Sequence, residues 1–328
     1  MTRHDPHDIA VVIPARNEAD RITACLTPLL AQARDRLRII VVVNNTTDAT
    51  ARIAERMCAV AGTSHCVLDT TLPANQGVGT ARKLGAETAF AVMPRLKYLL
   101  TTDADCIVAP DWVARNLRHL AQVDAVCGDV RPIPEEVGLL SGMDGKLAEM
   151  EGRYRALVLQ FYRTYAPDPH NFRAHHGEAS GASLGFRASA YASVGGFADV
   201  KCGEDRDIIR RLGQTGFAVR HTDDVLVQAS LRLSGRAPGG MSDALRERTS
   251  GHIYLVDECL PPADWLWSRR NSLPVWPPED KDYDRIPVQG LPAHIARLEQ
   301  VLLEWEAPSR HLAETFSAPA SDLEISLG

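Results

Sequence analysis

The stretch IAVVIPARNE (residues 9–18) is decisive for the fold, because a continuous apolar run stops at a proline and gives way to polar residues. Arg38–Val43 and Lys97–Thr101 repeat this pattern, and a polar turn follows each of them. Helical patterns separate these apolar runs, at residues 18–33, 50–60 and 79–90. Continuous apolar strands that alternate with helices predict a parallel sheet covered on both faces. Such a sheet binds ligands at the carboxyl ends of its strands, so the polar turns should converge on one cleft.

The composition of the 328 residues is that of a globular chain, with 45% hydrophobic and 24% charged residues. The formal net charge of −6 argues against a protein that binds nucleic acid through a basic surface. The seven cysteines form no C-x-x-C pair, so we expect reduced thiols. No apolar run approaches the ~20 residues of a membrane helix. We therefore expect a cytoplasmic protein without an integral membrane segment.

The second half of the chain has a different organisation. There we predict strands at 124–130, 181–186, 218–221 and 225–229, and helices at 138–165, 188–194 and 205–212, in addition to a short strand at 66–68 in the first half. After residue 234 the composition shifts, with predicted helices at 243–259 and 293–305 around a segment rich in proline and tryptophan. This divides the chain into an α/β domain, residues 1–236, and a C-terminal extension, residues 237–328. Within the domain, residues 1–130 and 131–236 form two halves.

Thr102-Asp103-Ala104-Asp105 follows the apolar run at Lys97–Thr101. Two carboxylates at this spacing on a turn can face one cation, and hard oxygen ligands suit Mg²⁺ or Mn²⁺. The alternative is an acidic turn that caps a helix starting near Asp111.

A second acidic group is Gly203-Glu204-Asp205, with Asp207 nearby. These acids precede residues with helical spacing, so they lie at a helix N-terminus. A carboxylate there could act as a general base that deprotonates a hydroxyl group. The alternative is that the acids only complement the helix dipole.

A glycine-containing stretch, Asn75–Gly85, precedes a predicted helix. Its glycines would let backbone N–H groups approach a phosphate, and Arg82 or Lys83 would add positive charge. The stretch matches neither G-x-G-x-x-G nor a P-loop, so an ordinary turn is the alternative.

Taken together and in this order, the motifs over about residues 9–240 resemble those of family 2 glycosyltransferases with the GT-A fold. The stretches that carry the resemblance are VVIPARNE at 11–18, the strand at 38–43 with its polar turn, Asn75-x-Gly77 with Ala81, Arg82 and Gly85, Asp103-x-Asp105, GASLGFR at 181–187 with VGGF at 194–197, GED at 203–205 with Asp207, and Ser230-x-Arg232 with Gly235-Arg236. The resemblance implies a Rossmann-like, mostly parallel sheet flanked by helices, followed by a helical and irregular C-terminal extension. It also implies inverting transfer of a hexose from a nucleotide-sugar donor, with a UDP- or GDP-sugar favoured, to the hydroxyl group of an unknown acceptor.

The resemblance also assigns roles to individual residues. The nucleotide-sugar pocket would be lined by Pro14, Ala15, Arg16, Glu18, Asn44, Asn75, Arg82, Asp103, Ala104, Arg232 and Arg236. A Mg²⁺ or Mn²⁺ ion would be bound by Asp105 and Asp103, with His221 as a further ligand. Glu204 and Asp205 would face the acceptor, and we favour Asp205 as the catalytic base.

The turn after the second strand departs from the family pattern. Family members usually carry Asp-Asp-Gly-Ser-x-Asp there, whereas this chain has Asn44-Asn45-Thr46-Thr47-Asp48. Because asparagine offers a donor where aspartate only accepts, the identity of the nucleotide base stays open. Two other functions also stay open: a sugar-phosphate nucleotidyltransferase, and a non-catalytic GT-A module that binds a sugar or a partner.

For several further residues we favour a structural role. His175 and His176 are expected at the surface or in a lid, and a structural role for His221 is the alternative to metal binding. The apolar positions of 139–161 are expected to pack in a core rather than to bind a lipid. Three tryptophans are expected to anchor the C-terminal segment: Trp265, Trp267 and Trp276.

Overall fold

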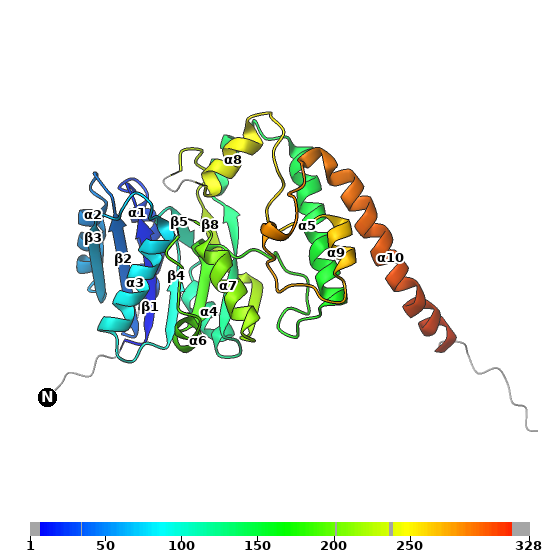
Figure 1. Ribbon diagram of the computed structural model, residues 1–328. Helices are drawn as coiled ribbons and strands as arrows, with labels where there is room; N and C mark the ends of the chain where they lie inside the picture. Colours follow the sequence, from blue (N-terminus) through cyan, green and yellow to red (C-terminus); the bar gives the residue numbers. More distant parts are fainter. Residues whose placement is uncertain (1–6, 34, 201, 236–238, 317–328) are drawn as a thin grey trace, which may run out of the picture.

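A computed structural model describes residues 7–33, 35–200, 202–235 and 239–316. Within these residues, eight strands form one sheet in the order β3-β2-β1-β4-β7-β6-β8-β5 (Figure 1). The strands are β1 Ile9–Ala15, β2 Leu37–Asn44, β3 His65–Thr70, β4 Tyr98–Thr101, β5 Cys106–Val108, β6 Ala125–Pro132, β7 Leu184–Arg187 and β8 Val219–Ala229. Neighbours from β3 to β4 are parallel, β7 is antiparallel to β4 and β6, and β8 is parallel to β6. The expected mostly parallel α/β sheet is confirmed.

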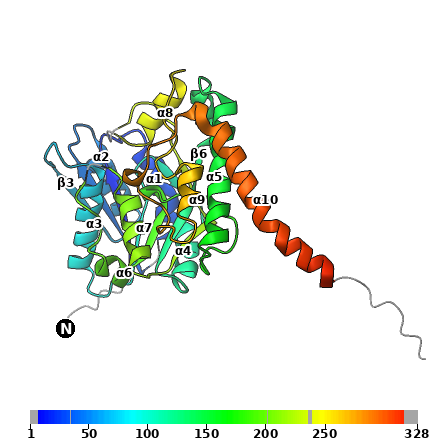
Figure 2. The same cartoon turned by 45° about the vertical axis from the view of Figure 1, so that its right-hand side comes forward.

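Helices cover both faces of the sheet (Figures 1 and 2). One layer contains α1 Ile22–Gln32, α2 Thr50–Val60 and α4 Trp112–Leu120, and the other contains α3 Val78–Val92, α6 Ala188–Ser193 and α7 Glu204–Gln214. Strand β1 shows why both layers form: Val11 and Ile13 pack in the first core, while Ala10 and Val12 pack in the second. Each buried valine or isoleucine stabilises the fold by roughly 1.5–3 kcal/mol.

Three strand predictions are wrong in detail because they depend on pairing across the sheet. The two strands expected at 218–221 and 225–229 are one strand, β8, whose register against β6 shifts between Gly128 and Asp129. The segment expected as a strand from residue 181 starts as a 3₁₀ turn, and β7 begins only at Leu184. Strand β5 is a short addition that pairs antiparallel with the end of β8.

The remaining elements are a 3₁₀ helix at Pro134–Leu140, α5 Gly145–Tyr165, α8 Met241–Thr249, α9 Ala263–Ser268, short 3₁₀ turns at Asp280–Asp282 and Val288–Gly290, and α10 Leu291–Phe316. A third core beside the sheet is formed by α5, α9, α10 and buried residues of the segments 254–260 and 286–288. Aromatic residues of α5 pack against the tryptophans of the extension, for example Tyr162 against Trp276 at 5.2 Å between ring centroids. The anchoring role of the tryptophans is therefore confirmed, while the boundary after residue 236 stays a prediction.

Two helix predictions in this part are corrected. The helix expected over 138–165 is interrupted after Leu140, and α5 restarts at Gly145, with the Asp144 side chain accepting from two backbone N–H groups of its first turn. Leu139 is therefore 49% exposed, whereas Tyr154, Val158 and Phe161 are buried as expected. The helix expected over 243–259 ends at Thr249, because the following residues extend across the extension and Leu255 forms a β-bridge with Pro287. Within the described part of the chain, no helix combines the length and apolarity needed to cross a membrane.

Candidate active site

The Asp103–Asp105 turn lies directly beyond the carboxyl end of β4. Thr102 still donates to the carbonyl of Val12 in β1, at 3.3 Å, and the next residues leave the sheet. Asp103, Asp105 and Cys106 place their ligand atoms within 4.8 Å of one another, which is the spacing that a metal ion needs. The capping alternative has no support, because both carboxylates bind arginines and no side chain caps the N-terminus of α4.

Arg82 joins the two acidic motifs of the sequence. It is buried on α3, and its guanidinium group donates to Glu204 of α7 and to Asp103 after β4. A Cβ atom at Gly181 would overlap this guanidinium group, so glycine is required for the arginine to reach across. The structure therefore brings Glu204 to Asp103 through one side chain, although about one hundred residues separate them.

Arg232 forms a second bridge, between the loop after β1 and the Asp103–Asp105 turn. Its Nη1 lies 2.7 Å from Glu18 Oε2, and its Nη2 lies 2.8 Å from Asp105 Oδ2. Glu18 is buried at the end of the β1 loop, so this ion pair is well shielded from water. Strand β8 and its continuation therefore hold the Asp103–Asp105 turn against the β1 loop.

Burial dominates the electrostatics of the turn. It raises the pKa of Asp105 to about 6, with Asp103 and Glu18 adding to the rise and Arg232 opposing it. The pKa of the Cys106 thiol is raised well above its ordinary value by burial and by the two neighbouring carboxylates. The thiol is therefore neutral, and the carboxylate oxygens are the ligands that this group offers to a hard cation.

The three acids in the first turn of α7 differ in burial and in hydrogen-bond partners. Gly203 adopts a φ of 83°, a left-handed conformation that favours glycine, and the helix starts at the next residue. Glu204 is buried against Arg82, whereas Asp205 is half-buried and accepts from the backbone N–H of Gly181 at 2.9 Å. Asp207 pairs with Arg211 along the same helix. Among the acids of this motif, Asp205 is thus the one whose half-buried carboxylate forms no ion pair with an arginine in the described structure.

The other residues assigned to the nucleotide pocket lie mostly at neighbouring strand ends. Pro14 and Ala15 end β1 beside Val42 and Val43, and Asn44 follows directly at the end of β2. Asn44 is buried and donates to Asn45 Oδ1 at 3.1 Å. Further positions are the exposed Arg16, the exposed Asn75 before α3, and the buried Ala104. Arg236 lies outside the described residues.

The expected role of His221 as a metal ligand is not supported. His221 lies opposite Cys127 in the β6–β8 pair and stacks on His175, with ring centroids 4.8 Å apart. It is absent from the group of ligand atoms around Asp103 and Asp105. His175 and His176 are half-buried rather than at the surface, because they pack on this strand.

Some contacts of the site were not anticipated from the sequence. Cys106 lies in the group of ligand atoms with Asp103 and Asp105. Its place next to Asp105 in the sequence was the one signal that could have predicted this. Arg206 of α7 binds Asp257 at 2.9 Å and Glu258 at 2.5 Å, which ties α7 to the extension. Its position between two acids of the motif gives no hint of these distant partners.

Comparison with known proteins identifies the family. The sequence profile of glycosyl transferase family 2 matches residues 10–190, which is more than half of the chain. The chain belongs to this family and has a GT-A fold. This agrees with the expected family and fold and argues against the sugar-phosphate nucleotidyltransferase.

Individual relatives are distant. The glycosyltransferase AglE of Haloferax volcanii is 27% identical over 126 residues, 37% of this chain and 39% of that protein. The structure of S. aureus TarS 1–349 with UDP-GlcNAc has a TM-score of 0.50 and 16% identity, covering 76% of this chain and 62% of that one. The mannosyltransferase PcManGT from Pyrobaculum calidifontis, with GDP-Man and Mn²⁺, has a TM-score of 0.55 and 18% identity, covering 96% and 81%. The chain thus spans under two thirds of the first two proteins, and the structural likenesses show the fold.

Proposed function

We propose that the protein transfers a hexose from a nucleoside-diphosphate sugar to an acceptor hydroxyl group, with inversion at the anomeric carbon. The observation that carries this proposal is the position of Arg82, which contacts both Asp103 on the donor side and Glu204 on the catalytic helix. The two motifs are therefore parts of one cleft. TarS binds UDP-GlcNAc and PcManGT binds GDP-Man and Mn²⁺, which supports a donor of the same class for this chain.

The carboxylates of the turn fit a divalent cation. Arg82 contacts one oxygen of Asp103 and Arg232 contacts Oδ2 of Asp105. The second oxygen of Asp103, and Asp105 Oδ1, which accepts a weak hydrogen bond from the Cys106 thiol at 3.7 Å, are the atoms that could bind a metal. Oxygen ligands of this kind suit Mg²⁺ or Mn²⁺. When bound, the cation would stabilise the negative charge of the leaving nucleoside diphosphate.

Asp205 is the proposed general base. Its Oδ2 atom is held by the N–H of Gly181 and its Oδ1 atom by the N–H of Arg206, at 2.9 and 2.8 Å. These two bonds fix the orientation of the carboxylate, and its half-buried position leaves it accessible from the cleft. Asp205 would take the proton of the acceptor hydroxyl, which then attacks from the face opposite the leaving group.

Glu204 has a different proposed role. It is 1% exposed and bound to Arg82, so it positions the arginine rather than meeting an acceptor. Arg82 and Arg232 would in turn supply positive charge next to the diphosphate. The side chains of Pro14, Ala15, Arg16, Asn44, Asn75 and Ala104 remain the proposed lining of the nucleotide pocket.

Slow hydrolysis of the donor tests this proposal without a known acceptor. A panel of UDP- and GDP-sugars with Mn²⁺ should include one that the protein hydrolyses, and Asp105→Ala should lower the rate by roughly 10²–10³-fold. The exposed Asp20, changed to alanine, is the matched control and should keep the rate. If no donor is bound or hydrolysed, the chain is better explained as a non-catalytic module.

A further inference from the structure

Three side chains connect the first turn of α7 to other parts of the chain, while its N-cap residue, Gly203, has no side chain to contribute. Glu204 binds Arg82 of α3, and Asp205 accepts from the backbone that precedes β7. The third side chain is that of Arg206, whose guanidinium group binds two acids of the C-terminal extension. The backbone N–H of the same residue donates to Asp205 Oδ1 at 2.8 Å. Arg206 therefore lies between the proposed base and the extension and is bonded to both.

Asp257 is a firmly held partner for this arginine. Its Oδ2 atom lies 2.9 Å from Arg206 Nη2 and 3.5 Å from Arg155 of α5, and its Oδ1 atom accepts from the N–H of Cys259 at 2.9 Å. The N–H of Asp257 itself donates to Glu151, also on α5, at 3.2 Å. Burial opposes the charge of this carboxyl, yet the guanidinium groups of Arg206 and Arg155 hold the pKa of Asp257 well below its ordinary value. Asp257 is therefore an ionised anchor that joins α7 to α5.

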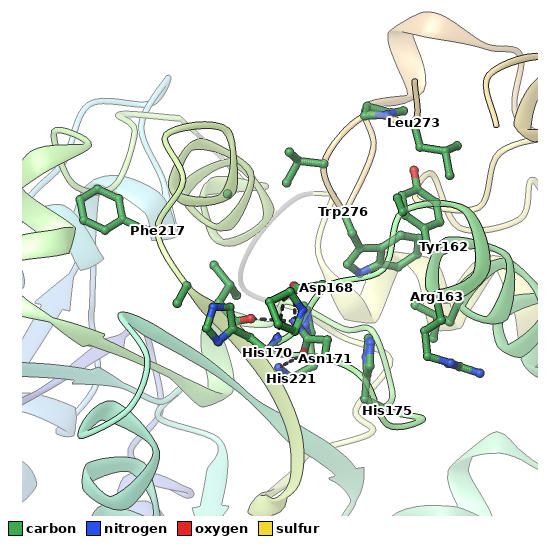
Figure 3. Close-up of a pocket in the computed structure, with 18 of the residues that line it drawn as sticks. Tyr162, Arg163, Asp168, His170, Asn171, His175, Phe217, His221, Leu273 and Trp276 are labelled. Atoms are coloured by element: carbon green, nitrogen blue, oxygen red, sulfur yellow. Dashed lines mark hydrogen bonds between the residues drawn. The ribbon is translucent and has the colours of Figure 1, made fainter. Parts of the chain in front are cut away.

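A second ion pair joins α7 to the extension one turn further from the base. Arg210 Nη1 lies 2.9 Å from Glu279 Oε1. In the last turn of the helix, Gly213 and residues 273–276 of the extension line a cavity of about 400 Å³ (Figure 3). The extension thus follows the helix along its length, but Arg206 is the anchored residue that adjoins Asp205. The pair at Arg210 provides an internal comparison, because it is of the same kind and lies on the same helix.

The anchoring of Arg206 bears on the geometry of the base. One of the two hydrogen bonds that orient the Asp205 carboxylate comes from the backbone of Arg206, so the place of Arg206 decides where that bond lies. A misplacement of about 1 Å can lower a catalysed rate on the order of 10²-fold. We propose that Arg206, held by Asp257 and Glu258, is a positioning residue for Asp205, so that the extension forms part of the catalytic apparatus. This inference rests on the proposed function, in which Asp205 is the general base.

Two other roles of Arg206 lead to different expectations. An ion pair that only stabilises the fold would have the same effect on turnover as the pair at Arg210. An electrostatic effect on Asp205 would depend on the sign of the charge that is removed. Arg206→Met removes a positive charge near the base, whereas Asp257→Asn removes a negative one. Electrostatics alone would therefore change turnover in opposite directions, whereas a loss of position lowers turnover in both variants.

Steady-state donor hydrolysis by the full-length protein tests the positioning role. Arg206→Met and Asp257→Asn should each lower kcat by about 10–100-fold, because the carboxylate is no longer held in place. The KM for the donor and the calorimetric affinity for the nucleotide should stay within about twofold of wild type, since the Asp103–Asp105 site is unchanged. Arg210→Met is the matched control and should keep kcat within about twofold. Arg206→Lys should recover part of the loss, because an ammonium group can still bind one of the two acids.

A double-mutant cycle gives a readout that a merely structural role would not produce. In the Asp205→Asn background, Arg206→Met should lower the residual rate by less than about threefold, because the carboxylate to be positioned is already absent. Wild-type kcat in Arg206→Met or Asp257→Asn, opposite changes in these two variants, an equal loss in Arg210→Met, or a full further loss in the Asp205→Asn background would overturn the inference. If wild type turns over and Asp205→Asn does not, these outcomes overturn the positioning role alone. A wild type without turnover would overturn the proposed function and this inference together.

Discussion

The Asp103–Asp105 site and the histidine-lined region both bury polar groups, and both leave some buried atoms without hydrogen-bond partners in the described structure, but the groups differ in charge. In the Asp103–Asp105 site, the buried carboxylates of Glu18 and Glu204 each contact a guanidinium group. In the histidine-lined region, His175 and His221 are neutral at pH 7, because burial lowers the pKa of each imidazole. Charged pairs are organised to receive a charged ligand, whereas neutral groups stay buried without a charged partner.

The largest expected effect concerns Asp205, the proposed general base. Asp205→Asn keeps one side-chain oxygen, which can accept from the N–H of Gly181 or of Arg206 but not from both, and its amide cannot take up a proton. We expect donor hydrolysis to fall by about 10²–10⁴-fold while donor binding is retained. Asp207→Asn is the control, because Asp207 lies two residues further along the same helix and is paired with Arg211. This variant should retain activity. Unchanged turnover in Asp205→Asn would remove this residue from the mechanism.

The next effect tests the charge pairing itself. Arg82→Met leaves Glu204 buried without its partner, which should lower the free energy of unfolding by about 3–5 kcal/mol. Adding Glu204→Gln should recover part of this loss, because the uncompensated charge is then removed. Urea denaturation measures both, with the exposed Arg52→Met as a control within about 0.5 kcal/mol of wild type. Equal stability of Arg82→Met and wild type would contradict the pairing.

A fall in pH should change the stability contributed by His175 and that contributed by Asp105 in opposite directions. The folded pKa of His175 is lowered from 6.5 to about 4 by burial, so unfolding takes up a proton in this window and stability falls as the pH falls through it. The folded pKa of Asp105 is raised from 3.8 to about 6 by burial, so this group adds stability as the pH falls through that window. The two contributions can be separated by substitution.

His175→Phe should remove about 1–2 kcal/mol of the stability loss between roughly pH 7 and 5. Asp105→Asn should instead make the loss steeper, because the compensating proton is no longer bound. Urea denaturation at both pH values measures these slopes, and the exposed His252→Phe serves as the control. Identical slopes for all variants would refute the buried neutral state of His175.

The smallest effect is expected from the hydroxyl group of Tyr162. Tyr162→Phe removes a hydroxyl without a partner in the described structure, so the free energy of unfolding should change by less than about 0.5 kcal/mol or rise. Tyr154→Phe is the contrast, because that hydroxyl donates to the Pro261 carbonyl at 2.5 Å. Its loss should cost about 1–2 kcal/mol. Similar costs for both variants would mean that Tyr162 has a structural partner.

The pattern of apolar residues correctly predicted those helices and strands that can be recognised from their own residues alone. The helix at Thr50–Val60 and the strands at Ile9–Ala15 and Leu37–Asn44 are examples, since their apolar residues alternate or recur within one element. Strand β5 could not be found this way, because three residues gain their structure from β8 far along the chain. The helix expected to reach residue 259 ended early for the same reason, since the bridge to Pro287 is non-local.

The same difference between local and non-local signals applies to the candidate site. Motif order placed Asp103, Asp105, Glu204 and Asp205 in one predicted cleft, and the Arg82 bridge agrees with that placement. The partner of each acid was not predictable, because a guanidinium group can reach any of several carboxylates. His221 was predicted as a metal ligand because it follows the acidic helix in the sequence. Its actual neighbours depend on the β6–β8 register, which places it opposite Cys127 and which the sequence does not reveal.

Calorimetric titration of nucleotides is the most direct test of the central claim that the Asp103–Asp105 cleft binds a nucleotide-sugar donor. UDP and GDP would each be titrated with and without Mn²⁺, into wild type and into Asp105→Asn. The account predicts that one nucleotide binds to wild type, more tightly with Mn²⁺, and that Asp105→Asn loses the gain from the cation. Binding of neither nucleotide, or binding that Asp105→Asn leaves unchanged, would contradict it.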